Sequence, residues 1–194
     1  MRHLIGRKGN RKLPDTIGIF NLPQRSTCPG ATPWCKQYCY AKKAERQYKQ
    51  TRPYRELNYK LSLQDNFVDM INKELKTCGK KFIRIHESGD FYNQKYLDKW
   101  VSIVKANPNI SFTFYTKSFA FLNFNKMKRC KNVIAFASLD PTTPKDQLKK
   151  AKHWKKAFIL GAYVPKNTFV CSGSCKSCDH CYVQSKLNVG FRKH

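Results

Sequence analysis

The chain has 194 residues, of which 41% are hydrophobic and 13% aromatic, which is enough for one globular domain with a core. Lysine and arginine number 38 against 12 acidic residues, a formal net charge of +26 at pH 7. These figures exclude a disordered basic tail, and no apolar run is long enough to span a bilayer. The basic N-terminus lacks the apolar segment of a secretory signal, so we expect a cytoplasmic location.

The single domain is predicted to comprise a basic N-terminal arm at 1–14, a βα core at 15–165 and a cysteine-rich metal-binding tail at 166–194. Hydrophobic periodicity and turn residues place the elements of the core. The first half begins with a strand at 15–23 and a cysteine-rich loop, followed by a helical stretch from about Trp34 that breaks near Pro53. A helix at 61–79, a strand at 81–90 and a helix at 93–108 come next. The core ends with strands at 109–118 and 132–140, a helix at 143–157 and a strand at 157–165.

Two of these helices are amphipathic, and their apolar sides are expected to face the core. Gly79 is the expected stop of the helix at 61–79, whose apolar side consists of Leu63, Phe67, Met70, Ile71 and Leu75. The apolar side of the helix at 93–108 consists of Tyr96, Leu97, Trp100, Ile103 and Val104.

The alternation of strands and helices indicates βα units and a mostly parallel sheet. Five strands are too few for a closed eight-stranded barrel, so the predicted fold is an α/β partial, open βα barrel with a cysteine-rich C-terminal tail. In such sheets, functional groups gather at the carboxyl ends of the strands. The first cysteine loop and the "HESGD" turn at 86–90 are both expected at this edge.

Nine cysteines are present, an odd number in a chain without a secretory signal, and this favours metal binding over a disulfide framework. Cys78 and Cys130 stand alone and are interpreted as small core residues. The other seven fall into two groups, which are Cys28, Cys35 and Cys39, and Cys171, Cys175, Cys178 and Cys181.

The second group, "CSGSCKSCDHC", is one compact run, which favours a 4Fe–4S cluster over zinc, because structural zinc usually takes two separated pairs. The first group supplies three thiolates, the number that a cubane cluster with one open iron requires. Zinc held by three thiolates and a distant histidine is the alternative there, with His194 as a remote candidate. A single site with ligands from both groups also stays open, so one or two clusters are expected.

A polar group follows the second predicted strand. His86, Glu87 and Asp90 are candidate acid, base or substrate-orienting side chains, because sites gather at strand ends in this architecture. The structural alternative is a helix N-cap by Asp90 or Asn93. Tyr38 is a candidate to pack on a cofactor, and packing within the first helix is the alternative.

Runs of basic residues with few acids predict a surface that contacts the phosphates of DNA or RNA. One run contains Tyr48 and Tyr54, whose rings could stack on exposed bases. There is no motif for base-specific readout, and each run alone is compatible with a solvated face. The candidate nucleic-acid residues are Lys42, Lys43, Arg46, Lys49, Arg52, Arg55, Lys149, Lys150, Lys152, Lys155 and Lys156.

The cysteine loop ending in "YCYA", between the first strand and the first helix, resembles the start of a radical S-adenosylmethionine (SAM) barrel. The resemblance implies that Ser88, Gly89 and Asp90 replace a Gly-Gly-Glu-like turn that holds the methionine part of SAM. Two features depart from that pattern. The cysteine spacing is C-x6-C-x3-C instead of C-x3-C-x2-C, and Asp90 is shorter than glutamate.

A closer resemblance is to the phage gene-product-eighty-eight-like family, through "TCPGA", "CYA", "RIHESGDF" and "FYTKS". It implies a phage- or mobile-element-encoded protein in the host cytoplasm, and it implies architecture more than activity. Three functions are predicted as alternatives. They are an iron–sulfur protein with a nucleic-acid-binding surface, a divergent radical SAM enzyme that modifies DNA or RNA, and a zinc-stabilised, non-catalytic phage module.

Overall fold

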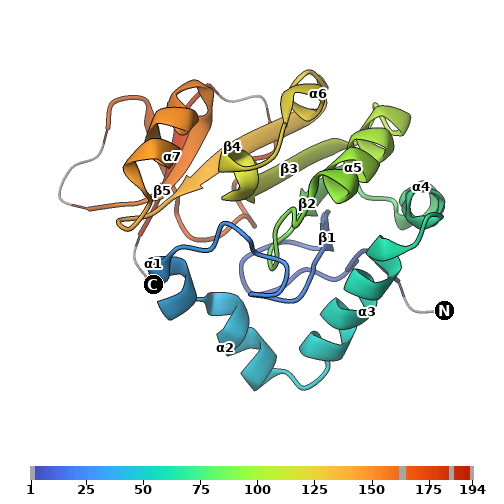
Figure 1. Ribbon diagram of the computed structural model, residues 1–194. Helices are drawn as coiled ribbons and strands as arrows, with labels where there is room; N and C mark the ends of the chain where they lie inside the picture. Colours follow the sequence, from blue (N-terminus) through green and yellow to red (C-terminus); the bar gives the residue numbers. More distant parts are fainter. Residues whose placement is uncertain (1–2, 162–164, 184–185, 193–194) are drawn as a thin grey trace.

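One open sheet runs through the computed structural model, which describes residues 3–161, 165–183 and 186–192 (Figure 1). Every neighbouring pair of its seven strands is parallel. From edge to edge the strands are β1 (Ile17–Phe20), β2 (Phe82–Ile85), β3 (Ser111–Thr116), β4 (Val133–Leu139), β5 (Lys155–Ile159), β7 (Asn188–Phe191) and β6 (Thr168–Val170). The predicted α/β class and the open parallel sheet are therefore confirmed.

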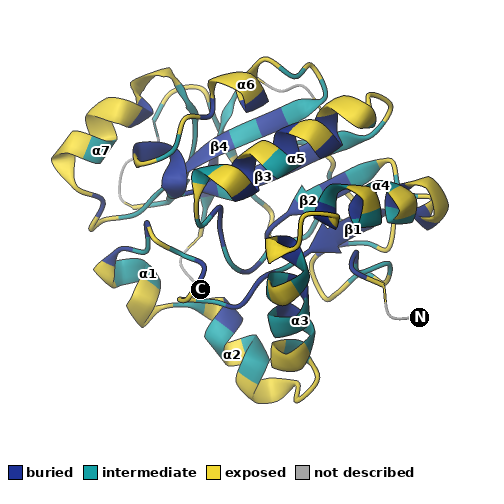
Figure 2. Ribbon diagram, turned by 45° about the vertical axis from the view of Figure 1, so that its right-hand side comes forward, coloured by how far each residue is buried: buried dark blue, intermediate teal, exposed yellow. Residues whose placement is uncertain are grey.

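The main core lies between helices and one side of the sheet, which we call the helix face. Here Phe67 and Trp100 pack against Ile83, Phe112 and Phe114, and Figure 2 shows the buried strands behind the partly exposed helices. The helices are α1 (Pro33–Gln37), α2 (Tyr40–Gln47), α3 (Thr51–Leu63), α4 (Phe67–Cys78), α5 (Gln94–Ala106), α6 (Asn125–Lys128) and α7 (Lys145–Lys150), with short 3₁₀ turns at Ser118–Ala120 and Ala151–His153.

Because side chains alternate along a strand, the sheet has a second face, which carries both apolar and charged side chains. In β2, Ile83 and Ile85 belong to the core of the helix face, while Phe82 and Arg84 project to the other side, as the two-residue period of a strand requires. Phe82 packs there against Tyr182. We call this side the second face.

The helical stretch predicted from Trp34 is divided into α1, α2 and α3, and Pro53 lies in the first turn of α3 instead of ending a helix. Proline is tolerated there because the first N–H groups of a helix have no intrahelical partner. The helix predicted at 61–79 is interrupted before Phe67, so Leu63 is exposed and does not join the buried side. Gly79 follows α4 with a φ of 65°, which confirms the predicted stop.

The inward side of α5 is confirmed, since all five predicted residues are buried. Asn93 caps this helix by accepting a hydrogen bond from the Tyr96 N–H at 2.8 Å, as the structural alternative proposed. The helix predicted at 143–157 is too long. It ends at Lys150, and Lys155 already pairs with Phe136 of β4, so sheet pairing overrides the local helical pattern.

The predicted tail is part of the sheet, and its order explains where the second cysteine group lies. β7 stands between β5 and β6, so the chain reverses its direction across the sheet after β6. Crossovers between parallel strands are right-handed. A crossover that runs back across the sheet, against the direction of the earlier ones, therefore passes over the other face of the sheet. The connection from β6 to β7 does so, because Tyr182 packs against Ile17 and Phe82 on the second face.

The N-terminal arm is also anchored. Leu4 and Ile5 are buried, and their backbone N–H groups donate to the Glu74 carboxylate of α4 at 2.7 and 3.3 Å. Gly6 then forms a bridge to Ile19, beside the outer edge of β1. The arm predicted as a separate basic segment therefore contributes to the core.

Candidate metal centre

The first cysteine loop is fastened along the carboxyl edge of the sheet. A Cβ at Gly30 would come within 2.8 Å of the Lys117 carbonyl oxygen, after β3. Thr32 Oγ1 donates to the Asp140 carboxylate, after β4, at 2.5 Å. The same carboxylate oxygen accepts from Lys117 Nζ at 2.7 Å. The loop therefore reaches from β1 across to the ends of β3 and β4.

Three cysteines meet at one cavity of about 150 Å³ beneath this loop, and they are Cys28, Cys35 and Cys39. The cavity is also lined by the first residues of α2, by the turn after β2 and by the second face through Arg84 and Tyr115. The three thiols that the sequence singles out thus come together at the carboxyl edge of a parallel sheet, where functional groups are expected.

Burial controls the chemistry of two of these thiols, Cys28 and Cys35. Burial, followed by the nearby Asp90 carboxylate, raises the pKa of Cys28 to about 12. Burial also raises the pKa of Cys35, against an opposing effect of Lys117. Such thiols are neutral at pH 7 and poor nucleophiles, because the thiolate is the reactive form. Coordination to a metal would deprotonate them.

The donor set fits some metal groups better than others. In the part of the chain that the structure describes, no three His, Cys, Asp or Glu side chains are gathered closely enough to hold a single ion. Tetrahedral zinc, with bonds of about 2.3 Å, would bring thiolate sulfurs to about 3.8 Å from one another. A cubane cluster carries each thiolate on a separate iron, so its ligands lie farther apart. The three thiols around the cavity are soft donors, the kind that zinc and iron–sulfur clusters both take.

The turn after β2 packs tightly on the loop after β1. Gly89 has a φ of 83°, and a Cβ there would lie 2.5 Å from Leu22 Cβ and 2.7 Å from Thr27 Oγ1. Ser88 donates its hydroxyl to the Leu22 carbonyl at 2.9 Å and its N–H to Asn21 Oδ1 at 2.8 Å. Both residues border the cavity, and both are occupied with holding the two loops together.

Asp90 also has a structural role, because its carboxylate is hydrogen-bonded within the fold. Its buried carboxylate accepts four hydrogen bonds, from Thr116 Oγ1 at 2.6 Å and from the N–H groups of Phe91, Lys117 and Ser118 at 2.8, 2.8 and 3.3 Å. A carboxylate has about four acceptor positions, so none is left for a substrate or for the amino group of a cofactor. Burial raises the Asp90 pKa, and these hydrogen bonds oppose the rise.

His86 does not have the exposure of an acid–base catalyst. Its side chain is buried on the helix-face side, with Nε2 2.8 Å from the Tyr96 hydroxyl and its ring near Phe91 and Trp100. Burial, followed by the charge of Arg84, lowers the His86 pKa to about 3. These features count against the predicted acid–base role of His86, because a ring that stays neutral has no second proton to give; the role stays a prediction.

The remaining predicted polar residues lie around the rim. The Glu87 carboxylate accepts from Asn10 Nδ2 at 2.8 Å. Tyr38 is 48% exposed and packs on Trp34, with ring centroids 4.5 Å apart, so the packing alternative fits it better than a cofactor contact. Tyr40 lines the cavity instead and donates its hydroxyl to the Glu87 carbonyl.

Arg84 is the cavity residue that sequence reasoning missed. Its guanidinium carbon lies 3.9 Å above the centroid of the Tyr115 ring, and Nε donates to the His86 carbonyl at 3.1 Å. Among the described residues, no carboxylate lies within ion-pair distance of it. The available signal was a charge that alternates with apolar residues in "FIRI", the sequence of β2.

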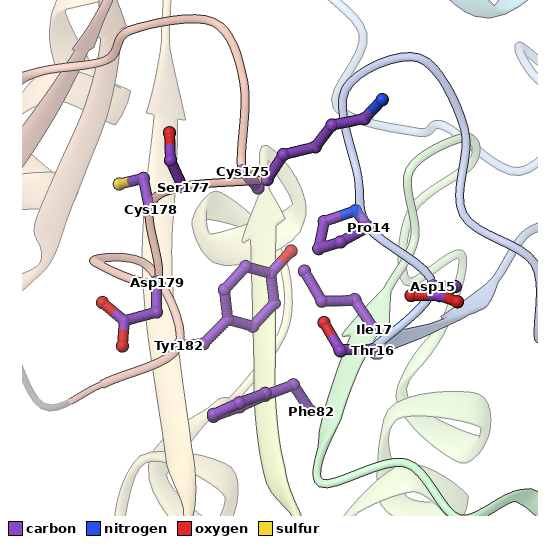
Figure 3. A pocket seen from close by; sticks show the side chains of 11 residues that line it. Pro14, Asp15, Thr16, Ile17, Phe82, Cys175, Ser177, Cys178, Asp179 and Tyr182 are labelled. Carbon is purple, nitrogen blue, oxygen red and sulfur yellow. The ribbon is translucent and has the colours of Figure 1, made fainter.

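The second cysteine group lies on the second face. Cys175 and Cys181 pack beside Tyr182, and Figure 3 shows Cys175 and Cys178 at a separate cavity of about 580 Å³ near the start of β1. Cys175 and Cys178 line this cavity, and none of the four cysteines of the second group lines the first one, so the described residues do not form the shared site that the sequence left open. The remote ligand candidate His194 lies outside the described residues.

The predicted nucleic-acid residues separate by exposure. Arg55 is buried, pairs with Glu45 at 2.9 Å and donates to the Ala41 carbonyl at 3.1 Å, so its assignment to a surface is wrong. Through these contacts Arg55, in α3, joins this helix to α2. Lys42, Lys155 and Lys156 are partly buried, the last two in β5. The exposed members are Lys43, Arg46, Lys49, Arg52, Lys149, Lys150 and Lys152.

Comparison with known proteins identifies the family. The family model described as "Gene product 88" matches residues 3–168. The chain belongs to the Gene product 88 family. This confirms the closer of the two resemblances seen in the sequence. The match stops before the second cysteine group.

Two curated relatives of this Gene product 88 chain are similar over much of their length. The Gene 88 protein of Mycobacterium phage L5 is 30% identical over 165 residues, covering 77% of this chain and 67% of the relative. The Gene 88 protein of Mycobacterium phage D29 is 29% identical over 142 residues, covering 65% and 59%. The chain thus spans about two thirds or less of the length of these relatives, and the phage connection is confirmed.

Two further comparisons are negative. No solved structure matches the chain, so the radical SAM resemblance gains no support from this source. Among the described helices, none has both the length and the hydrophobicity to cross a membrane.

Proposed function

We propose that this Gene product 88 protein binds a 4Fe–4S cluster through Cys28, Cys35 and Cys39, with the fourth iron open to the cavity. The observation that carries the proposal is the convergence of these three partly buried thiols on one cavity at the carboxyl edge of a parallel sheet. When bound, such a cluster supplies redox chemistry and one coordination position for a ligand.

The surroundings support a cluster over the other uses of cysteine. All nine cysteines are free thiols, and burial keeps Cys28 and Cys35 protonated until something displaces their protons. A cluster with thiolate ligands is anionic, and the cavity offers positive charge in Arg84 and Lys117, although Asp140 already pairs with the latter. The Gly30 contact with Lys117 holds the loop in place before any metal arrives.

We further propose that the exposed basic residues bring nucleic acid to this cavity. α2 has two roles in this proposal. Its first residues, Tyr40 and Ala41, line the cavity, while Lys43 and Arg46 are exposed. A phosphate backbone held on α2 would therefore lie beside the cluster. The formal charge of +26 supports a polyanionic partner.

A radical SAM enzyme in a partial barrel, acting on DNA or RNA, is the second candidate. The cavity beside the three cysteines favours it, since a cofactor would bind next to the open iron. The side chains of Ser88 and Asp90 count against it, because their hydrogen bonds are used within the fold. We therefore rank cluster binding ahead of SAM chemistry.

The test is the metal and sulfide content of anaerobically prepared protein. We expect Cys28→Ser/Cys35→Ser/Cys39→Ser to lose about four iron and four sulfide per chain relative to the native sequence. Cys130→Ser is the matched control, because this partly buried thiol bonds only the Lys126 carbonyl and should leave the iron unchanged. Stoichiometric zinc without sulfide would overturn the proposal and favour the zinc-stabilised module. Cleavage of added SAM by reduced, loaded protein would favour the enzyme.

A further inference from the structure

Arg84 lines the first cavity and also acts on the second cysteine group, and within the described fold its charge has no acidic partner. The side chain is partly buried on the second face, stacked on Tyr115, and no carboxylate of the described residues pairs with it. A cation held out of water without a counter-charge is costly, and an arginine cannot lose its proton to relieve the cost. The site therefore calls for an anion.

The groups around the guanidinium indicate where that anion lies. Arg84 interacts electrostatically with Tyr115, Tyr182, Tyr40 and Cys181, and also acts on Cys175 and His86. Tyr115, on which Arg84 stacks, packs in one cluster with Cys171 and Cys181. Cys175 and Cys181 belong to the second group, which the β6–β7 crossover carries onto the same face. The Tyr115 hydroxyl lies against the Cys181 sulfur, so Arg84, Tyr115 and Cys181 form one contiguous cluster.

The crossover that carries these cysteines is fixed by backbone contacts around them. The Cys175 N–H donates to the Lys12 carbonyl, and the Cys171 N–H donates to the Gly190 carbonyl, both at 2.8 Å. Ser111 Oγ donates to the Tyr182 carbonyl at 2.8 Å. The backbone thus holds the crossover against the segment before β1 and against β3 and β7. The four cysteines are free thiols whose described polar contacts are few, among them the Gly173 N–H with Cys171 at 3.3 Å and Tyr115 with Cys181.

We infer that Cys171, Cys175, Cys178 and Cys181 bind a second, fully ligated metal–thiolate centre, and that Arg84 is its partly buried counter-charge. Four thiols release their protons to solvent on coordination, and a cubane cluster or a zinc ion with four thiolates is then a net anion. A single zinc ion would require the sulfurs to draw closer together than they lie in the described structure. The centre would join the β6–β7 crossover to the second face. Arg84 acts through the cysteines and is a positioning residue for the metal.

The experiment isolates the second group. In the Cys28→Ser/Cys35→Ser/Cys39→Ser background, any metal bound belongs to the second group, so its result is independent of the cluster proposed above. This protein is loaded either with Zn²⁺ alone or with Fe²⁺ and sulfide, and bound metal is then titrated with a chelator. We expect one centre per chain, and Cys175→Ala/Cys181→Ala should abolish it. Which of the two metals is retained distinguishes zinc from an iron–sulfur cluster.

Arg84 variants test the counter-charge. Arg84→Gln and Arg84→Met should release the metal at about tenfold lower chelator concentration, the effect of losing a group that supports metal ligands. Arg84→Lys, which retains the charge, should recover most of the affinity. Far-UV circular dichroism of each variant checks the fold. An Arg84→Gln protein that folds and holds metal as tightly as its parent overturns the role of Arg84. Full metal content in Cys175→Ala/Cys181→Ala overturns the site itself.

Discussion

His86 is a buried histidine with one ring nitrogen bonded to Tyr96 and the other, Nδ1, without a hydrogen-bond partner among the described residues. Its pKa of about 3 lies far below the value of about 6.5 that an unfolded chain retains. As the pH falls below about 6.5, the unfolded state gains a proton at His86 that the native state does not accept. Stability therefore decreases toward acid.

The size of this effect is measurable. We expect His86 to cost the protein about 2 kcal/mol of unfolding free energy between pH 7 and pH 5. The backbone at His86 has a φ of 65°, a conformation that asparagine tolerates, so His86→Asn is a suitable non-titrating variant. Its loss of stability over the same pH range should be smaller by this amount. Urea unfolding curves of both proteins at the two pH values give the difference, and equal losses would contradict a neutral, buried His86.

Single residues also show what the sequence alone conceals. Arg55 and Arg84 both lie near other basic residues in the sequence, yet neither side chain is a free charge on the surface. Arg55 finds Glu45 ten positions earlier only because α2 and α3 pack together. Arg84 projects from β2 to a face whose covering segment comes about a hundred residues later. Burial created by distant segments cannot be inferred from local composition.

At the scale of elements, the Arg55–Glu45 pair holds α2 against α3. Both side chains are largely buried, at 5% and 10% exposure, whereas the Arg52–Glu56 pair on α3 has 71% and 46%. A buried guanidinium that loses its carboxylate keeps the cost of desolvation, while an exposed one is rehydrated. The two ion pairs should therefore differ strongly in their contribution to stability, although both have distances near 2.9 Å or less.

We expect Glu45→Ala to lower the free energy of unfolding by about 3 kcal/mol. Glu56→Ala is the matched control and should change it by less than about 1 kcal/mol. Chemical denaturation of the two variants measures both values. Similar effects of the two substitutions would mean that the α2–α3 contact does not depend on the buried pair.

The elements themselves were predictable to the extent that their patterns are local. β1 to β5 and the apolar side of α5 follow from alternation and helical periodicity, and these predictions are confirmed. β6 and β7 were missed, because they have only three and four residues and adjoin cysteines and polar residues. The pairing of β7 with β5, and of β6 with β7, decides their structure. The convergence of the first three cysteines was predictable from the rule for parallel sheets, whereas the separation of the two groups depends on the strand reversal.

At the scale of the whole molecule, charge is the dominant property. With 38 basic and 12 acidic residues, fewer than a third of the basic side chains can have an acidic partner of their own. The excess repels itself and is offset when a polyanion binds and releases its counterions. Binding of nucleic acid should therefore weaken strongly as salt rises.

The proposed surface can be tested through this salt dependence. Lys43→Gln/Arg46→Gln/Lys49→Gln removes three exposed charges on α2 and directly after it. We expect the slope of log affinity for a single-stranded oligonucleotide against log salt to become shallower by about 2. Lys73→Gln/Lys76→Gln removes exposed charges from α4, which does not line the cavity, and should change the slope less. Equal slopes in all proteins would place the contact elsewhere.

The order of the last strands has a consequence for the chain as it folds. β6 has β7 as its neighbour in the sheet, and the segment between them carries four cysteines. β6 and all four thiols therefore precede, along the chain, the strand through which β6 joins the sheet. β1 to β5 precede them both and can pair with one another without β6 or β7. The cysteine segment therefore gains its fixed position only when β7 pairs with β5 and β6.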